Sequence, residues 1–221
     1  VCVVAVTTTP AQLASGRCGV VGGFRVAQAH HSDIRCAGRM RREIGIRTLM
    51  NVLGPMTNPA GATRQVIGVF SQDWQRKVAQ VLQLLGSEHA MVVHSNGLDE
   101  IRLDAPTHVV EVKQGVITEY DMSPEGFGLA PRTREENAAI VADSAETSLA
   151  LVKQSLTDDG SAAADIVALN AGAAIYVSGI ANSMANGVAM AQDAISSGLA
   201  NERLTELVRI TSLMSKTDTQ S

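Results

Sequence analysis

Two adjacent carboxylates, Asp99 and Glu100, are the residues of this sequence best placed to hold a metal ion. They follow HAMVVH (89–94), an apolar run that predicts a buried strand, and a short polar turn separates them from it. On a loop at the carboxyl end of a strand, both carboxylates can point into the crevice where α/β proteins bind ligands. Carboxylate oxygens are preferred ligands of Mg²⁺, which often shares them with substrate phosphates. A solvated acidic pair is the alternative interpretation.

A second group of polar residues lies upstream, in the segment AHHSDIRCAGRMRREIG (29–45) and just beyond it. Its arginines are Arg35, Arg39, Arg41, Arg42 and Arg47. A guanidinium group is a planar fork that binds a carboxylate or phosphate through two hydrogen bonds. The segment therefore predicts an anion site, unless it forms only a charged helix face, and the residues alone do not choose among the arginines. His30 and His31 are adjacent and lack the i, i+4 spacing of a helical zinc pair.

A third candidate is DIVALNAGAAIYVSG (165–179), where Asn170 and Gly172 lie among small residues. Small side chains allow two backbones to approach closely, so this pattern favours tight helix packing over ligand contact. The motifs GxGxxG, GxxxxGK[ST], GxSxG and HExxH do not occur, so the sequence indicates neither a phosphate-cradling loop nor a nucleophile.

Composition narrows the class of protein. The chain has 221 residues, 45% of them apolar and 18% charged, which is typical of a globular protein. A net charge of −4 argues against a general nucleic-acid-binding or polybasic membrane surface. Three cysteines without CxxC spacing favour free thiols in a reducing cytoplasm. The small-apolar run 171–181 is too short to span a bilayer, and no positive residues precede the initial VCVVAV as they would in a signal peptide.

The periodicity of apolar residues predicts an α/β fold with a mixed central sheet flanked by helices. Strands are expected at 65–70 and 89–94, and a meander at 100–103, 107–113 and 116–123. Helices are expected at 73–86, 134–154, 162–181, 186–198 and 201–214. Residues 60–64 mark the change from a loop-rich part to this regular part.

Four stretches together resemble the anthranilate phosphoribosyltransferase family. They are RREIGIRTLMNVLGPMTNPAGATRQVIGVF (41–70), LGSEHAMVVHSNGLDEIRL (85–103), EYDMSPEGFGL (119–129) and DIVALNAGAAIYVSGIA (165–181). The match runs in register from about residue 41 to about residue 198, and residues 1–40 match more loosely. Because several separate motifs agree in order and spacing, the resemblance is specific.

The resemblance implies an architecture. The family joins a small helical domain to a larger α/β domain of the nucleoside phosphorylase/phosphoribosyltransferase type, and substrates bind between them. We expect residues 1–40 to be a divergent segment joining the large domain, 41–62 a remnant of the helical domain with its hinge loop, and 63–221 the α/β domain. In LGPMTNP (53–59) the prolines restrict φ, so the loop can form a firm wall for a flat aromatic substrate.

The resemblance also implies a reaction, part of tryptophan biosynthesis. The amine of anthranilate displaces pyrophosphate from phosphoribosyl pyrophosphate, giving phosphoribosylanthranilate, and no covalent nucleophile is needed. By matching motif, Arg41 would hold the anthranilate carboxylate, and His31 and Pro55 would line the same pocket. Asp99 and Glu100 would bind Mg²⁺ on the pyrophosphate side. The family forms homodimers, and neither a nucleic-acid nor a membrane partner is expected.

The chain departs from the family pattern in its first part. The glycine-rich phosphoribosyl pyrophosphate loop, the Lys and Ser contacts that follow it, and the early helices that build the homodimer have no counterpart here. Ser32-Asp33-Ile34-Arg35 stands where the family has Pro-Ala-Met-Lys, and Asp33 would be unfavourable if it faced an anion pocket. We therefore expect the 221-residue chain to be a fragment without measurable transferase activity by itself. The alternatives are a related pyrimidine nucleoside phosphorylase, a non-enzymatic paralogue that binds nucleic acid, and a decayed product with a partial fold.

Overall fold

The computed structural model describes residues 56, 61–157 and 160–217, with side chains described as far as residue 213. The chain divides into two compact units, one containing the described residues up to Gly198 and the other containing those from Leu199 onward. The expected boundaries near residues 40 and 62 fall mostly outside the described residues and stay predictions.

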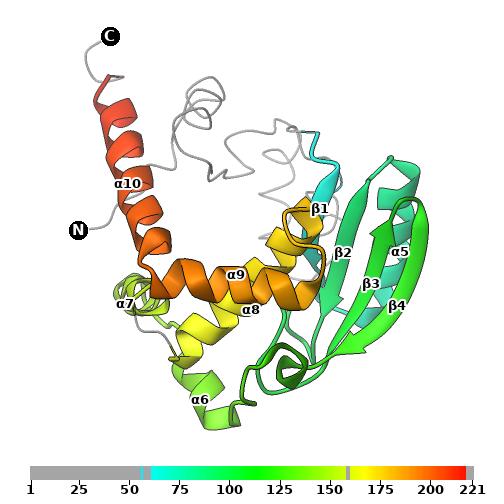
Figure 1. Cartoon of the computed structure of the whole chain (residues 1–221), viewed down its shortest axis with the longest axis horizontal. Coiled ribbons are helices and arrows are strands. Elements are labelled where there is room, and N and C mark those ends of the chain that lie inside the picture. Colours follow the sequence, from blue (N-terminus) through cyan, green and yellow to red (C-terminus); the bar gives the residue numbers. More distant parts are fainter. Residues whose placement is uncertain (1–55, 57–60, 158–159, 218–221) are drawn as a thin grey trace, which may run out of the picture. The chain divides into compact units, whose positions relative to one another are not determined.

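A four-stranded mixed sheet in the order β1-β2-β3-β4 forms the framework of the first unit (Figure 1). The strands are β1 (Arg64–Gly68), β2 (His89–His94), β3 (Thr107–Lys113) and β4 (Val116–Met122). β1 and β2 are parallel, and the other two pairs are antiparallel. The predicted α/β fold with a mixed sheet is therefore confirmed.

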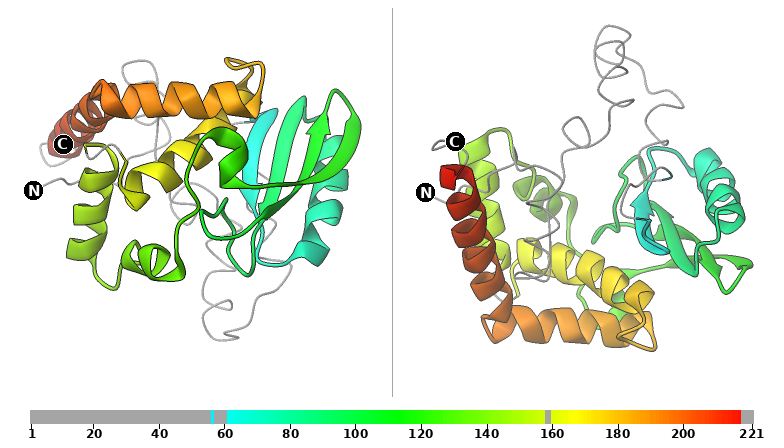
Figure 2. Two further views of the ribbon diagram at one scale, coloured as in Figure 1. Left: turned by 60° about the horizontal axis from the view of Figure 1, so that its bottom comes forward. Right: turned by 90° about the horizontal axis from the view of Figure 1, so that it is seen from above.

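Helix α5 (Gln72–Leu84) connects β1 to β2, as a parallel pair requires. Val78 and Leu82 are buried as the sequence predicts, whereas Val81 and Leu85, expected on the same apolar face, are 37% and 62% exposed. Helix α8 (Ala162–Ser178) packs on β1 and β2 from the side opposite α5 (Figure 2). Because both faces of the sheet are covered, β2 is an almost continuous apolar run without polar alternation.

The segment 100–103 is not a strand, so that expectation was wrong. Its backbone groups find partners other than a neighbouring strand. Ile101 pairs with the side chain of Asn170, and the Arg102 N–H donates to Thr107 Oγ1 at 3.3 Å. The Leu103 carbonyl accepts from the Arg132 N–H at 3.2 Å. Side chains and loop backbone thus supply the hydrogen bonds that a neighbouring strand would have supplied had this segment been a strand.

The single helix expected at 134–154 is two helices, α6 (Arg134–Ala139) and α7 (Ala145–Ser155), which follow the short 3₁₀ helix η1 (Pro124–Phe127). Each has its own N-terminal cap. Thr133 forms a capping box with Glu136, and the Ser144 side chain accepts from the Thr147 N–H. The second cap restarts the chain in a new direction.

Helices α8 and α9 (Met184–Ser196) pack closely where Gly172 of α8 meets Gly187 of α9. A Cβ added to Gly172 would lie 2.6 Å from Val188 Cγ2 and 2.7 Å from the Val188 backbone. The tight packing predicted at Gly172 is confirmed. α8 ends three residues before the expected position 181, because Gly179 adopts a left-handed conformation with φ of +85°.

The second unit is represented by helix α10 (Leu199–Thr217), which is longer at both ends than the predicted 201–214. Arg209 pairs with Glu206 one turn earlier, and the Thr211 hydroxyl donates to the Leu207 carbonyl. Among the helices of the described ranges, none combines the length and apolar character needed to cross a membrane.

Candidate functional site

A cavity of about 430 Å³ opens at the carboxyl ends of β1 and β2, against the first half of α8. It is lined by Val66, Gly68, Val93, Asp99, Glu100, Ile166, Val167, Asn170 and Ala171. The carboxyl ends of parallel strands are where α/β proteins bind ligands. The structure therefore brings Asp99 and Glu100 to the kind of crevice that the sequence suggested, between mostly apolar walls.

The loop that carries Asp99 lies directly against the end of β1. A Cβ added to Gly68 would lie 2.5 Å from the carbonyl carbon of Asp99 and 3.0 Å from its Cβ. Real Cβ atoms do not approach backbone so closely, so only glycine permits this contact. Gly68 is therefore part of what sets the position of the carboxylate pair.

The turn between β2 and the carboxylates is held by His94. Its Nδ1 lies 2.8 Å from the Val69 carbonyl, and the Gly97 N–H donates to its Nε2 at 3.3 Å. A carbonyl can only accept, so Nδ1 carries the hydrogen and Nε2 accepts. Ser95 and Leu98 close the turn with reciprocal backbone hydrogen bonds. Both ring nitrogens are thus occupied, which makes His94 a residue that shapes the loop.

Burial and the neighbouring charge of Asp99 both raise the pKa of the Glu100 carboxyl. Asp99 and Glu100 are nevertheless exposed enough for a ligand to reach them. A divalent cation would relieve the repulsion between the two carboxylates. The electrostatics of the pair thus suit a cation site in which protons compete with the metal.

The donor set fits Mg²⁺ better than zinc. Within the part of the chain that the structure describes, no three His, Cys, Asp or Glu residues gather as they would around a metal ion. A structural or catalytic zinc site needs three or four protein ligands. Mg²⁺ is commonly held by one or two carboxylates together with water and substrate phosphates. Two carboxylates on an open cavity satisfy that smaller requirement.

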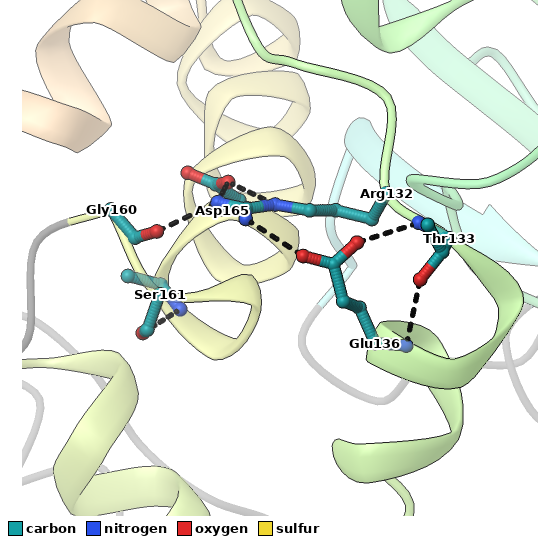
Figure 3. Close-up of polar contacts among 7 residues, drawn as sticks. Arg132, Thr133, Glu136, Gly160, Ser161 and Asp165 are labelled. Carbon is teal, nitrogen blue, oxygen red and sulfur yellow. Dashed lines mark hydrogen bonds and ion pairs between the residues drawn. The ribbon is translucent and has the colours of Figure 1, made fainter.

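Arg132, which the sequence did not single out, fixes the start of α8 (Figure 3). Its Nη2 donates to Asp165 Oδ2 and to the Gly160 carbonyl, each at 2.6 Å, and its Nη1 donates to Glu136 Oε1 at 3.3 Å. Asp165 is only 8% exposed, so this ion pair is largely shielded from water. Because the first half of α8 lines the cavity, Arg132 helps to place one of its walls. The Thr133–Glu136 capping pattern was the local signal that could have drawn attention to it.

The anthranilate-side candidates Arg41, His31 and Pro55 lie outside the described residues. Their predicted roles stay predictions. Asn170, assigned to helix packing from the sequence, contacts the acidic loop through its side-chain amide.

Residues 4–201 match the model of the glycosyl transferase family, a/b domain. The chain belongs to this family. Within the glycosyl transferase family, it is similar to proteins named anthranilate phosphoribosyltransferase. That of Stutzerimonas stutzeri is 47% identical over 210 residues, covering 93% of this chain and 60% of the relative. That of a Marinomonas species is 53% identical over 192 residues, covering 86% and 55%. The resemblance seen in the sequence is confirmed, and the chain spans less than two thirds of the length of these relatives.

Solved structures show the same fold. The anthranilate phosphoribosyltransferase of Thermus thermophilus superposes with a TM-score of 0.83 at 36% identity, covering 92% of this chain and 60% of that one. The Saccharomyces cerevisiae enzyme, in complex with phosphoribosyl pyrophosphate and Mg, gives a TM-score of 0.81 at 22% identity, covering 93% and 59%. At that identity the yeast likeness supports the fold alone.

Proposed function

We propose that this chain forms the metal- and pyrophosphate-binding part of an anthranilate phosphoribosyltransferase. The observation that carries the proposal is the Asp99–Glu100 pair on the cavity at the carboxyl ends of β1 and β2. The names of its relatives indicate transfer of a phosphoribosyl group to anthranilate, and the family resemblance implies phosphoribosyl pyrophosphate as the donor. The products would be phosphoribosylanthranilate and pyrophosphate, and the pathway tryptophan biosynthesis.

In this reaction the amine nitrogen forms a bond to C1 of the ribose while the bond from C1 to the pyrophosphate oxygen breaks. Negative charge accumulates on the departing pyrophosphate, and Mg²⁺, when bound, would neutralise it. Asp99 and Glu100 would hold that ion on the pyrophosphate side. Val66, Ile166 and Val167 give the cavity apolar walls, which limit water and strengthen electrostatic interactions inside it.

The remaining parts of the proposal rest on the family resemblance. Arg41 would bind the anthranilate carboxylate, with His31 and Pro55 beside it. The complete enzyme would be a cytoplasmic homodimer without nucleic-acid or membrane partners. These assignments share one requirement, which is a second part of the cleft that holds anthranilate close to C1 of the ribose.

The test supplies the part of the cleft that this chain does not cover. The uncovered part of the Stutzerimonas stutzeri relative is fused to the 221-residue chain, and anthranilate consumption is followed by its fluorescence. We expect loss of fluorescence only when phosphoribosyl pyrophosphate and Mg²⁺ are both present. Asp99→Asn and Glu100→Gln in the same fusion should each slow the reaction at least about tenfold, because they remove metal ligands.

Circular dichroism first establishes that each fusion is folded. A folded fusion that cleaves pyrimidine nucleosides with phosphate and leaves anthranilate untouched would favour the phosphorylase alternative. A reaction rate unaffected by Asp99→Asn and Glu100→Gln would contradict the assignment of the carboxylates. The chain without the fusion partner is expected to show no transferase activity.

A further inference from the structure

The Asn170 side chain joins α8 to the loop that carries the carboxylates. Its Oδ1 accepts from the Ile101 N–H at 3.0 Å, and its Nδ2 donates to the Ile101 carbonyl at 3.0 Å. Ile101 directly follows Glu100 in the chain. The amide therefore holds both backbone polar groups of the residue next to the acidic pair, across 69 positions of sequence.

The amide of Asn170 has no donor left for a ligand. Its Nδ2 also donates to the Ile166 carbonyl one turn earlier on α8, at 3.0 Å. A carboxamide carries two N–H donors, and both are engaged. Asn170 lines the cavity, yet as a donor it can act on a bound molecule only through the loop it holds.

The same loop also packs directly against Gly68 of β1. Asp99 lies against the glycine where a Cβ would clash with its carbonyl group, while the Ile101 side chain is buried in the core with 1% exposure. The peptide of Glu100 is thus held between β1 and α8. This restraint matters because two neighbouring carboxylates repel each other and would otherwise turn apart.

We propose that Asn170 is a positioning residue for the cation site, which orients Asp99 and Glu100 toward the same point in the cavity. The proposal rests on the proposed function, since it assumes that these carboxylates bind a divalent cation. Groups that hold metal ligands in place typically contribute tenfold or more to metal affinity. Loss of the Asn170 amide should therefore weaken cation binding while the fold persists.

The experiment measures the affinity of the 221-residue chain for Mn²⁺, used as a spectroscopic substitute for Mg²⁺, by water-proton relaxation at pH 7.5. The variants are Asp99→Asn, Asn170→Ala, Asn170→Ser and Tyr176→Phe. We expect Asn170→Ala and Asn170→Ser each to weaken Mn²⁺ binding about tenfold. Asp99→Asn, which removes a ligand, should weaken it at least as much.

The two further variants separate positioning from general stability. A serine on a helix can still bond the carbonyl four residues earlier, so Asn170→Ser keeps a partner for Ile166 and loses both bonds to Ile101. Tyr176 also lies on α8, but its hydroxyl bonds Glu111 and Lys113 and does not line this cavity. Tyr176→Phe should destabilise the same helix and leave Mn²⁺ affinity within about twofold of the unmodified chain.

Each outcome decides a different point. Mn²⁺ binding that is absent, or unchanged in Asp99→Asn, would overturn the metal role and the inference with it. Binding lost in Asp99→Asn but unchanged in Asn170→Ser would overturn the inference alone. An equal loss in Tyr176→Phe would show that affinity follows stability and would also overturn it. If Asn170→Ala does not fold, Asn170→Ser decides, and faster amide exchange at Ile101 in that variant provides a readout independent of metal.

Discussion

At the scale of single residues, the ionised carboxylate of Glu100 suits cation binding but lowers the free energy of unfolding when no metal is bound. Burial and then the charge of Asp99 raise the pKa of its carboxyl above the ordinary 4.5, so the folded chain binds a proton there more tightly than the unfolded chain does. The free energy of unfolding therefore decreases as pH rises from the ordinary value through the raised pKa. Glu100→Gln removes the charge, and we expect it to raise the Tm at pH 7 by about 1–2 °C without metal.

Thermal unfolding followed by circular dichroism measures this effect. At pH 4 the gain should nearly vanish, because Glu100 is then mostly protonated in the folded chain and resembles glutamine. Glu125→Gln, at an exposed position on η1, is the matched control and should leave the Tm unchanged. A lower Tm for Glu100→Gln at pH 7 would mean that attractive contacts hold this carboxylate.

At the scale of elements, the contact between α8 and α9 depends on the missing side chain of Gly172. A methyl group there would overlap the Val188 side chain and backbone, and backbone cannot yield as a flexible side chain can. Overpacking typically costs about 1–3 kcal/mol, and alanine recovers up to about 1 kcal/mol of helix propensity. Gly172→Ala should therefore lower the free energy of unfolding by about 1–2 kcal/mol.

Urea denaturation measures the change. Gly126→Ala is the matched control, since an added Cβ at Gly126 meets nothing within 4 Å. It should alter the free energy of unfolding by less than about 1 kcal/mol. Equal effects of the two substitutions would argue against a close α8–α9 contact.

At the scale of the whole α/β unit, Glu111 connects three strands and a helix. His89 Nε2 lies 2.7 Å from its carboxylate, and the Tyr120 and Tyr176 hydroxyls each donate to it at 2.9 Å. Burial raises the pKa of Glu111, but these hydrogen bonds outweigh burial and the pKa lies below 4.5. The resulting stability is present above pH 4.5 and is lost as pH falls through the lowered pKa.

Tyr120→Phe removes one of these donors and leaves the ring in place. We expect the free energy of unfolding at pH 7 to fall by about 1–2 kcal/mol, because a buried charged acceptor loses a partner. The pKa of Glu111 then rises toward its ordinary value, so the further loss of stability between pH 7 and pH 3 becomes smaller. Urea denaturation at both pH values tests this, and an equal loss at both would indicate a packing defect only.

Local patterns predicted much of the fold and part of the candidate site. The helix α5 with its buried residues Val78 and Leu82 and the apolar run of β2 depend on neighbours within a turn or two, so the sequence displays them directly. The N-cap residue Ser144 is a local indication of the break between α6 and α7. The apolar residues on both sides of it nevertheless suggested one continuous helix. The placement of Asp99 and Glu100 after a buried strand followed from the same local reasoning.

By itself, then, the sequence determined the order and type of most elements, the carboxylate pair and the family, but not the loop at 100–103 or the break between α6 and α7. Only the tertiary structure decided how that pair is held. Segment 100–103 has a strand-like pattern, yet the Asn170 side chain, far along the chain, bonds the backbone N–H and carbonyl of Ile101. Gly68, at the end of β1, leaves room for the backbone of Asp99 to approach closely. Such partners are chosen by which elements pack together, and each buried backbone group must find one. The periodicity of apolar residues indicates which side chains are buried. It does not indicate which distant side chain will form hydrogen bonds with a given backbone group.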